Sequence, residues 1–504
     1  MKKCFLFKAL CYALILTFAV LTAVSCGENE NDPAAPGNTE PEENNYSDDT
    51  ADPESPGVQE ESVERYQFPE DADYGGYNMR IITQDRSDWA WSEMWAEEEN
   101  GDPINDAIFT RNTKVEQELN IQITEFHVSD SSASARRAIT AGSDDYDVVF
   151  TDSAQGGNLA SQAMYINLYN VPGLYLEKPW WNQNAHQSAE LLGKLYFTTS
   201  DANLVTNDAI WVVYFNKTIL RDQGMDDPYA LVKNNEWTID AFYEMAKSAS
   251  IDIDGDGVWT VADQWGVSTH NLGFLAYFIC QDQQMVRLNE EGEPYLVSPD
   301  DKFVNAFTKA SRLMDTQGGL YLHAQGSYPG RTADLDHARK TFIHDMSLFC
   351  TEVLSHARAF REMEADFGLL PHPKYDGSQE QYLTFMIDTV PAFGIPVTVQ
   401  DPERSGVFME AMTGVSAETI MPAYYDVSLH GKFTIDEESI EMLDIIREGR
   451  VFDLAVLYNW GSYYSAIIDN GVSNSPNPVT VFERLEGRVT AAIEKTLEMF
   501  LELD

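Results

Sequence analysis

The sequence predicts an α/β fold built from two parts. Between residues 77 and 151, short segments with strand character alternate with longer segments of helical periodicity, and the alternation resumes between residues 211 and 269. This alternation predicts parallel strands that are joined by helices packed on the sheet. The length of 504 residues and the hydrophobic content of 43% provide for more than one core, since domains commonly have about 100–200 residues.

The first part begins near Tyr74, and its elements follow from short sequence patterns. Asp102 and Pro103 are typical of an N-cap and the first residue of a helix. Apolar residues recur after them on one helical face, at positions 104, 108, 115 and 119. The expected elements, in order, are a strand at 77–84, this helix, a strand at 121–126, a helix at 132–141 ended by Gly142, and a strand at 146–151.

The rest of the chain shows the same kinds of pattern. Its expected strands lie at 195–199, 211–215, 265–269 and 366–370, and a helix is expected at 239–250. Pro371-His372-Pro373 predicts an extended crossing. Helical periodicity returns around 440–446, before Gly449, and again from 481 to 500.

The N-terminus has the pattern of a secretory signal, because lysines precede an apolar run that ends at Val24. The run is shorter than the ~20 residues that a membrane span prefers. Ser25 followed by Cys26 resembles the lipobox of bacterial lipoproteins, in which the cysteine is lipidated and becomes the mature N-terminus. We therefore expect a signal peptide at 1–25, a lipid on Cys26 and a place on the outer face of the bacterial cytoplasmic membrane. A plain signal peptide with a chance cysteine is the alternative.

A strongly acidic segment follows the cysteine. Residues 27–64 contain 13 Asp or Glu and no Lys or Arg, and large apolar side chains are nearly absent. Such a segment cannot bury enough surface to fold, so we expect a disordered tether over residues 26–73. The whole chain carries a net charge of −49, which repels phosphate groups and argues against nucleic acid as a partner.

The sequence contains no catalytic signature. The Gly-x-Ser-x-Gly, His-Glu-x-x-His and phosphate-loop patterns are absent. His337 and His344 lie on an expected helix, where a surface pair is a better interpretation than a metal site. Cys280 and Cys350 remain beyond the signal and Cys26, and they form either one pair or two free buried thiols. We therefore expect a protein that is not an enzyme.

Residues 251–266, IDIDGDGVWTVADQWG, have the spacing of a twelve-residue calcium loop. The expected ligands are Asp252, Asp254, Asp256, the Val258 carbonyl, Thr260 and Asp263, with Gly257 at the sharp turn. The alternative is a solvated Asp/Gly turn. A strand, and not a second helix, follows the loop, so the paired helices of a calcium sensor are missing. We expect structural calcium that links helix 239–250 to strand 265–269.

Over residues 74–504 the chain resembles the extracellular solute-binding proteins of ABC importers, in their carbohydrate-binding branch, the maltose-binding protein family. The stretches that carry the resemblance are YDVVFTDSAQGGNLASQAMYINL, GKLYFTTSDANLVTNDAIWVVYFNKTIL, DFGLLPHPKYDGSQEQYLTFMIDTVPAFGIP and the run from Met421 to Trp460. The resemblance implies a two-lobe periplasmic-binding-protein-like fold with a hinge and a ligand cleft between the lobes. Lobe 1 would comprise 74–205 and 342–374, and lobe 2 would comprise 206–341 and 375–504.

The cleft of such a fold would be lined by loops at the carboxyl ends of strands. Sugar recognition needs apolar ring faces and groups that hydrogen-bond to hydroxyls. The candidate ligand-binding residues are Asp85, Trp89, Asp152, Asp208, His270, Asn271, Tyr424 and Trp460. The alternative for each aromatic residue is core packing, and for each Asp it is a turn or an N-cap.

The resemblance implies a monomeric receptor that captures a sugar or oligosaccharide and delivers it to an ABC permease. A secreted, lipid-anchored enzyme acting on polysaccharide is the first alternative, and a structural lipoprotein or adhesin is another. A peptide or another polar solute also remains open as the ligand.

Overall fold

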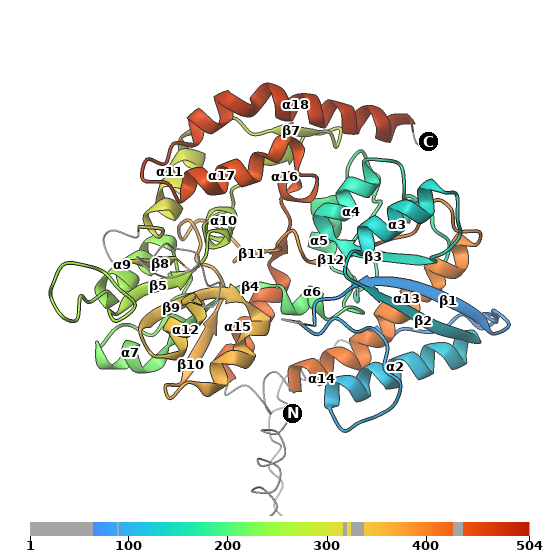
Figure 1. Ribbon diagram of the computed structural model, residues 1–504, viewed down its shortest axis with the longest axis horizontal. Coiled ribbons are helices and arrows are strands. Elements are labelled where there is room, and N and C mark those ends of the chain that lie inside the picture. The colour runs from blue at the N-terminus through green and yellow to red at the C-terminus, as the bar shows by residue number, and fades with distance from the viewer. Residues whose placement is uncertain (1–63, 88–89, 316–319, 324–336, 427–436, 503–504) are drawn as a thin grey trace, which may run out of the picture. The chain divides into compact units, whose positions relative to one another are not determined.

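The computed structural model describes residues 64–87, 90–315, 320–323, 337–426 and 437–502 (Figure 1). The chain divides into two units, Met1–Ser62 and Val63–Asp504, and everything below concerns the second. The expected signal peptide, Cys26 and most of the expected tether lie outside the described residues, as does Trp89.

The first sheet has four strands in the order β12-β3-β1-β2. Three of them, β1 (Tyr77–Gln84), β2 (Ile121–Val128) and β3 (Val148–Asp152), run parallel, while β12 (Pro391–Gly394) pairs antiparallel with β3. Their crossover helices are α2 (Pro103–Leu119) and α3 (Ser131–Thr140). The Asp102 side chain accepts the N–H of Ile104, so the predicted N-cap is confirmed.

The second sheet has five strands in the order β10-β4-β9-β5-β8. These strands are β4 (Trp211–Asn216), β5 (Trp265–Thr269), β8 (Tyr321–His323), β9 (Ser347–Val353) and β10 (Phe367–Leu370). β4 is antiparallel to both of its neighbours, whereas β5 is parallel to β8 and β9. The carboxyl ends of β5, β8, β9 and β10 therefore meet at one edge, together with the beginning of β4.

The chain passes between the two sheets along two adjacent segments. One leads through α6 (Val205–Asp208) into β4, and the other leads from β11 (Thr384–Phe385) to β12. Single bridges join them, Ile210 to Met386 and Thr198 to Phe393. We call these two segments, 198–210 and 386–393, the crossing segments.

The predicted lobe boundaries need correction in their second half. β9 and β10, within the return segment 342–374 assigned to lobe 1, pair with β4 and β5 of the second sheet. The first sheet instead receives β12, which the boundaries assigned to lobe 2. The crossing is accordingly at 386–393 and not at Pro371-His372-Pro373. The expected strand Leu195–Thr199 forms a single bridge, at Thr198, and no strand.

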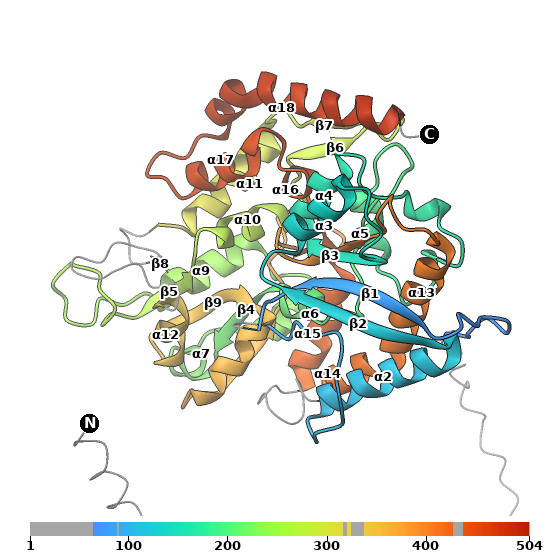
Figure 2. The same ribbon diagram turned by 45° about the vertical axis from the view of Figure 1, so that its right-hand side comes forward.

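Helices cover the sheets and add a C-terminal layer. Beside the first sheet lie α4 (Ser153–Ala160), α5 (Gln183–Ala189), α13 (Pro402–Glu418) and α14 (Ile420–Asp426); beside the second lie α7 (Lys217–Asp222), α8 (Pro228–Lys233), α9 (Ile239–Ala249), α10 (Leu272–Ile279), α11 (Asp301–Arg312), α12 (His337–Ile343) and α15 (Glu437–Glu448). The C-terminal layer comprises α16 (Leu454–Leu457), α17 (Tyr463–Gly471) and α18 (Pro478–Glu502). Figures 1 and 2 show α18 lying along α17 and β7.

Short elements complete the chain. They are the 3₁₀ turns Leu168–Asn170, Leu354–Glu362 and Trp460–Ser462, the strand pair β6 (Val286–Leu288) and β7 (Pro294–Leu296), and β13 (Arg450–Val451), which pairs with β11. No helix in the described ranges is both long and apolar enough to cross a bilayer.

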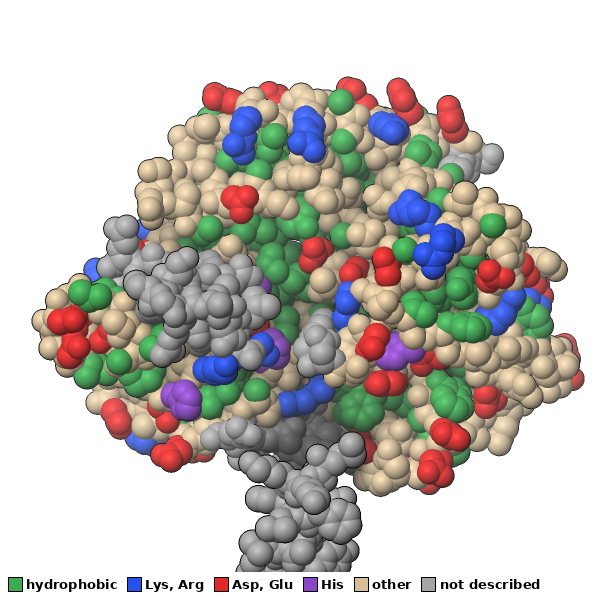
Figure 3. All heavy atoms as spheres, viewed as in Figure 1, with side chains coloured by type: hydrophobic (Ala, Val, Ile, Leu, Met, Phe, Trp, Pro, Cys, Tyr) green, Lys and Arg blue, Asp and Glu red, His purple; other side chains and the backbone are tan. Residues whose placement is uncertain are grey.

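The folded part begins earlier than the expected end of the tether at residue 73. Tyr66 is only 8% exposed, its N–H donates to Glu418, and its ring packs edge-on against Trp180 at a centroid separation of 5.7 Å. The Tyr66 ring and the Tyr66 backbone N–H therefore attach this end of an otherwise polar segment to the folded part. Cys280 and Cys350 are buried free thiols, and acidic side chains are spread over the face shown in Figure 3.

Candidate functional site

A polar cluster lies where β1 and β3 of the first sheet end. An Arg86 guanidinium N–H donates to the carboxylate of Asp152, the last residue of β3. Asp388 lies in the second crossing segment, where its carbonyl accepts the N–H of Ala154 at the start of α4. The Tyr464 hydroxyl donates to the Asp388 carboxylate at 3.0 Å. We call Arg86, Asp152, Asp388 and Tyr464 the first cluster.

Burial controls the charges of the first cluster. It raises the pKa of Asp152, although the neighbouring Arg86 opposes this effect, and the Asp388 charge raises it further. Burial also raises the pKa of Asp388, against the Tyr464 hydrogen bond. Two partly buried carboxylates beside one guanidinium leave acceptor capacity that a ligand hydroxyl can use.

A second polar cluster lies at the strand-end edge of the second sheet. His270 follows β5 directly, and its ring packs edge-on against Trp211 at 4.9 Å between centroids. Glu352 of β9 is bonded to His356 Nδ1 at 3.0 Å, and His356 Nε2 contacts Arg339 at 2.9 Å. We call His270, Glu352, His356 and Arg339 the second cluster.

The acidic and basic groups of the second cluster stabilise one another's charges. Burial alone would raise the pKa of Glu352, but the His356 hydrogen bond and the nearby histidine and arginine charges lower it. Burial lowers the pKa of His270, although Glu352 opposes this. A charged Glu352, whose side chain is 4% exposed, therefore orients His356 at this edge, where His356 and His270 are partly exposed.

Asp208 does not offer its carboxylate to a ligand in this structure. Its side chain is 1% exposed and accepts three hydrogen bonds: from the Trp91 N–H at 2.8 Å, from the Tyr424 hydroxyl at 2.9 Å, and from Arg358. In this structure the Asp208 carboxylate therefore has a structural role, and the ligand role expected from the sequence stays a prediction. A buried carboxylate with three protein donors ties α6 to α14 and to the turn after β9.

The two expected aromatic platforms also lie in the core. Tyr424 is 6% exposed, and its hydroxyl donates to the Asp208 carboxylate. Trp460 stacks on Tyr458 at 4.8 Å between centroids, and its indole N–H donates to Thr496 of α18. Both side chains thus pack in the core of this structure, which is the alternative that the sequence left open for each aromatic residue.

Of the other predicted residues, Asp152 and His270 fall into the two clusters. Asn271 follows His270, and its side-chain oxygen is buried without a hydrogen-bond partner among the described residues. Asp85 is half exposed and accepts both the N–H and the hydroxyl of Ser87, so it caps a local turn at the end of β1. Arg86, Asp388 and Glu352 have no motif in the sequence, and the one signal available was for Arg86, which comes shortly after the strand expected at 77–84.

The acidic loop is closed at its neck by reciprocal hydrogen bonds between Ile251 and Gln264. One carboxylate oxygen each of Asp252, Asp254 and Asp256 lies within 4.8 Å of the others, which makes these three the one such group in the part of the chain that the structure describes. Calcium–oxygen distances of about 2.3–2.6 Å allow opposite ligands to be about 5 Å apart, so the three side chains fit that ion.

The charges in the loop support the same fit. The Asp256 N–H lowers the pKa of Asp254, but desolvation and the charges of Asp256, Asp252 and Asp263 outweigh it, so the pKa is raised. Asp263 departs from the expected ligand set: it is 2% exposed, and it accepts the N–H groups of Ile253 and Thr260 together with the Thr260 hydroxyl. Asp263 and Thr260 therefore close the loop from inside.

No protein-family model matches the chain, and no curated protein matches it. Solved structures do. A sugar transporter from Rhizobium etli in an open conformation has 14% identity and a TM-score of 0.55, with 83% of this chain and 99% of that chain covered. A cyclo/maltodextrin-binding protein complexed with maltotetraose has 13% identity and a TM-score of 0.52, with 84% and 96% covered.

An ABC substrate-binding protein from Listeria monocytogenes in complex with cycloalternan has 13% identity and a TM-score of 0.50, with 84% and 98% covered. The chain has the two-lobed fold of the periplasmic solute-binding proteins. This confirms the fold class expected from the sequence. In a solute-binding-protein fold the two sheets are the cores of the lobes, so the two clusters mark the strand-end edge of each lobe. Open α/β sheets bind ligands outside the carboxyl ends of their strands.

Proposed function

We propose that this protein is a solute receptor that captures a sugar or oligosaccharide between its first and second clusters and presents it to an ABC permease. The observation that carries the proposal is the pair of polar clusters, one at the strand-end edge of each sheet. Carboxylates, guanidinium groups and imidazoles in buried or partly buried positions are groups that hydrogen-bond to sugar hydroxyls with defined geometry.

The similar solved structures support a carbohydrate as the ligand class, since those with TM-scores of at least 0.5 include proteins bound to maltotetraose and cycloalternan. By this proposal the protein acts outside the cell as a monomer held to the membrane by a lipid on Cys26. Mass spectrometry of the membrane fraction tests the anchor: an unmodified Cys26 would contradict it.

Isothermal titration of the mature chain with maltose, maltotetraose and raffinose tests the ligand. A charge-assisted hydrogen bond is worth roughly 1.5–3 kcal/mol, so Asp152→Asn should weaken sugar binding by about 10- to 100-fold. Asp222→Asn is the matched control, because Asp222 is 68% exposed and far from both clusters in the sequence. Binding of peptides or amino acids, and of no sugar, would contradict the carbohydrate assignment.

One observation favours an enzyme as the second candidate. Asp152 and Asp388 are neighbouring carboxylates whose pKa values are both raised by burial, and a pair of differently protonated carboxylates is what glycoside hydrolysis uses. Release of new reducing ends from starch, lost in Asp388→Asn, would favour this candidate. A receptor gives a stoichiometric complex and no turnover.

We also propose that Asp252, Asp254 and Asp256 bind calcium as a structural ion. The ion would neutralise three adjacent carboxylates between α9 and β5 and so stabilise the second lobe. Isothermal titration with calcium, compared between the natural chain and Asp254→Asn, tests this site directly.

A further inference from the structure

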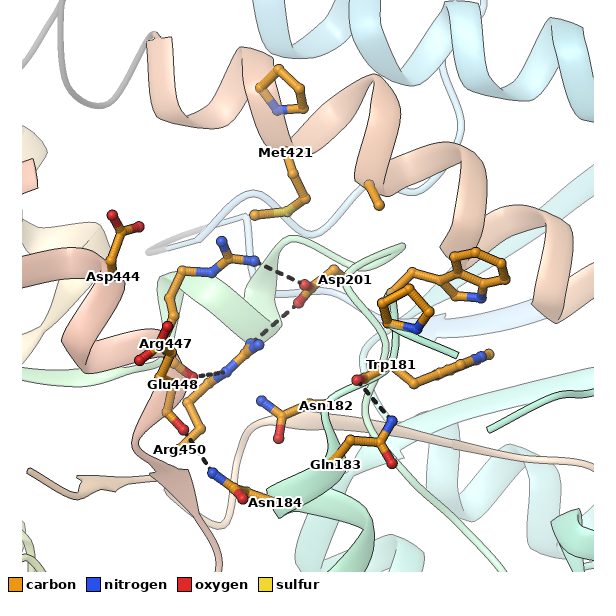
Figure 4. Close-up of a pocket in the computed structure, with 14 residues that line it drawn as sticks. Trp181, Asn182, Gln183, Asn184, Asp201, Met421, Asp444, Arg447, Glu448 and Arg450 are labelled. Atoms are coloured by element: carbon orange, nitrogen blue, oxygen red, sulfur yellow. Dashed lines mark hydrogen bonds and ion pairs between the residues drawn. The ribbon is translucent and has the colours of Figure 1, made fainter. Parts of the chain in front are cut away.

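Figure 4 shows a polar pocket of about 690 Å³ whose lining includes no residue of either cluster. Its walls come from the segment 179–184, from Asp201, from α14 and from the end of α15 with Arg450. We propose that this pocket is a second binding site, for one neutral mono- or disaccharide. Ligand pockets commonly have volumes of about 300–1,000 Å³, so the size is appropriate.

The charges that line the pocket favour a neutral ligand. Arg447 and Arg450 converge on Asp201, each at 3.2 Å (Figure 4). Burial alone would raise the pKa of Asp201, but the two arginines outweigh it and lower the value. Asp444 and Glu448 also line the pocket. These three carboxylates and two guanidinium groups nearly balance, so the pocket has no strong net attraction for an ion of either sign. A neutral polyol enters it without the cost of removing a charge from water.

Three consecutive amides supply hydrogen-bonding groups. Asn182 uses its oxygen to cap α5 at Ala185 N, and Asn184 uses its nitrogen for the Glu448 carbonyl. Gln183 donates to the carbonyls of Leu176, Lys178 and Trp181. The Asn182 NH₂ group and the Asn184 and Gln183 oxygens have no hydrogen-bond partner among the described residues. They give a ligand hydroxyl one donor group and two acceptors.

An aromatic wall is held in place beside these amides. Trp180 lines the pocket, and its indole N–H donates to Glu410 at 2.9 Å. The Tyr66 ring packs edge-on against the indole. Fixed indole rings next to amides are suited to the alternating C–H and O–H surface of a sugar ring, because the ring has an apolar face and a polar edge.

Fluorine NMR of the full chain labelled with 5-fluorotryptophan reports on this pocket directly. Trp180→Phe assigns the Trp180 signal, and glucose, galactose and maltose are the probes. We expect a saturable shift of that signal with at least one probe. Ala417→Trp fills the pocket from an exposed lining position and should abolish the shift. Ala491→Trp, at an exposed position of α18, should keep it.

Asp152→Asn separates this site from the proposed receptor site, since it should leave the Trp180 shift intact even where it weakens binding at the first cluster. The absence of a saturable shift with all three sugars would overturn the inference. A shift that survives Ala417→Trp would also overturn it, as would a response to glucuronate or inorganic phosphate without a response to the neutral sugars.

Discussion

Replacement of Asp208 by Asn should destabilise the folded chain strongly. The carboxylate accepts hydrogen bonds from the Trp91 N–H, the Tyr424 hydroxyl and Arg358, and it is 1% exposed. Asn retains one acceptor oxygen but turns an NH₂ group toward a donor. It also removes the charge that, against the desolvation of the guanidinium, raises the pKa of Arg358.

The expected magnitude follows from the burial of each partner. Removing one member of a buried ion pair costs about 3–5 kcal/mol. The Arg358 side chain is 33% exposed, so water replaces part of the lost interaction and the lower end of this range, about 3 kcal/mol, applies.

Urea unfolding of ligand-free protein, followed by circular dichroism, measures the difference. The matched control is Asp222→Asn: Asp222 pairs with Arg221 at 3.6 Å, with both side chains about 70% exposed, so its loss should cost less than about 1 kcal/mol. If the free energies of unfolding of the two variants differ by less than about 1 kcal/mol, Asp208 is not a structural link. That result would favour the ligand role expected from the sequence.

Three further predictions concern other parts of the fold. Chelation of calcium should lower the melting temperature of the natural chain and leave the melting temperature of Asp252→Ala unchanged. Free calcium at a hundred times the dissociation constant of the site stabilises the folded state by about 2.7 kcal/mol. Gly157→Ala should destabilise by about 1–3 kcal/mol, because a Cβ there would lie 2.2 Å from the Leu457 carbonyl oxygen, whereas Gly487→Ala, with nothing within 4 Å, should stabilise α18 by up to about 1 kcal/mol. Burial raises the pKa of Asp453 to about 7, so the folded state binds this proton more tightly than the unfolded state does. The free energy of unfolding should therefore fall as the pH rises from 4 to 7. Between pH 5 and pH 8, urea unfolding should show that Asp453→Asn loses about 3 kcal/mol less of this free energy than the natural chain does.

Local elements were predictable from the sequence because local patterns determine them. The strands at 77–84 and 265–269 have the expected bounds, and the α2 cap is where Asp102 and Pro103 predicted it. The lobe boundaries were not predictable in the same way. β9 is buried along its whole length, and an apolar run of this kind is equally compatible with either sheet. Only pairing with β4 and β5, which lie far away in the sequence, decides between the sheets.

The candidate site shows the same limit at the level of single side chains. Asp152 and Asp208 both lie beside a strand end, and nothing in the adjacent sequence separates them. Asp152 meets one guanidinium, while Asp208 meets three donors whose residues are 117, 150 and 216 positions away. A strand-end carboxylate therefore becomes a ligand group or an internal link according to what other segments bring to it.

The carboxylates in the crossing segments differ in how far protein groups already satisfy them. Asp201 is neutralised by Arg447 and Arg450, and Asp208 is enclosed by three donors. Burial raises the pKa of Asp388, in the other crossing segment, although the Tyr464 hydroxyl and the backbone N–H groups of Asp388 and Thr389 oppose this effect. A carboxylate in that state gains most from new donors. Sugar hydroxyls that reach Asp388 would therefore bind at a segment joining both sheets, so ligand capture and the relative position of the two lobes would depend on the same residue.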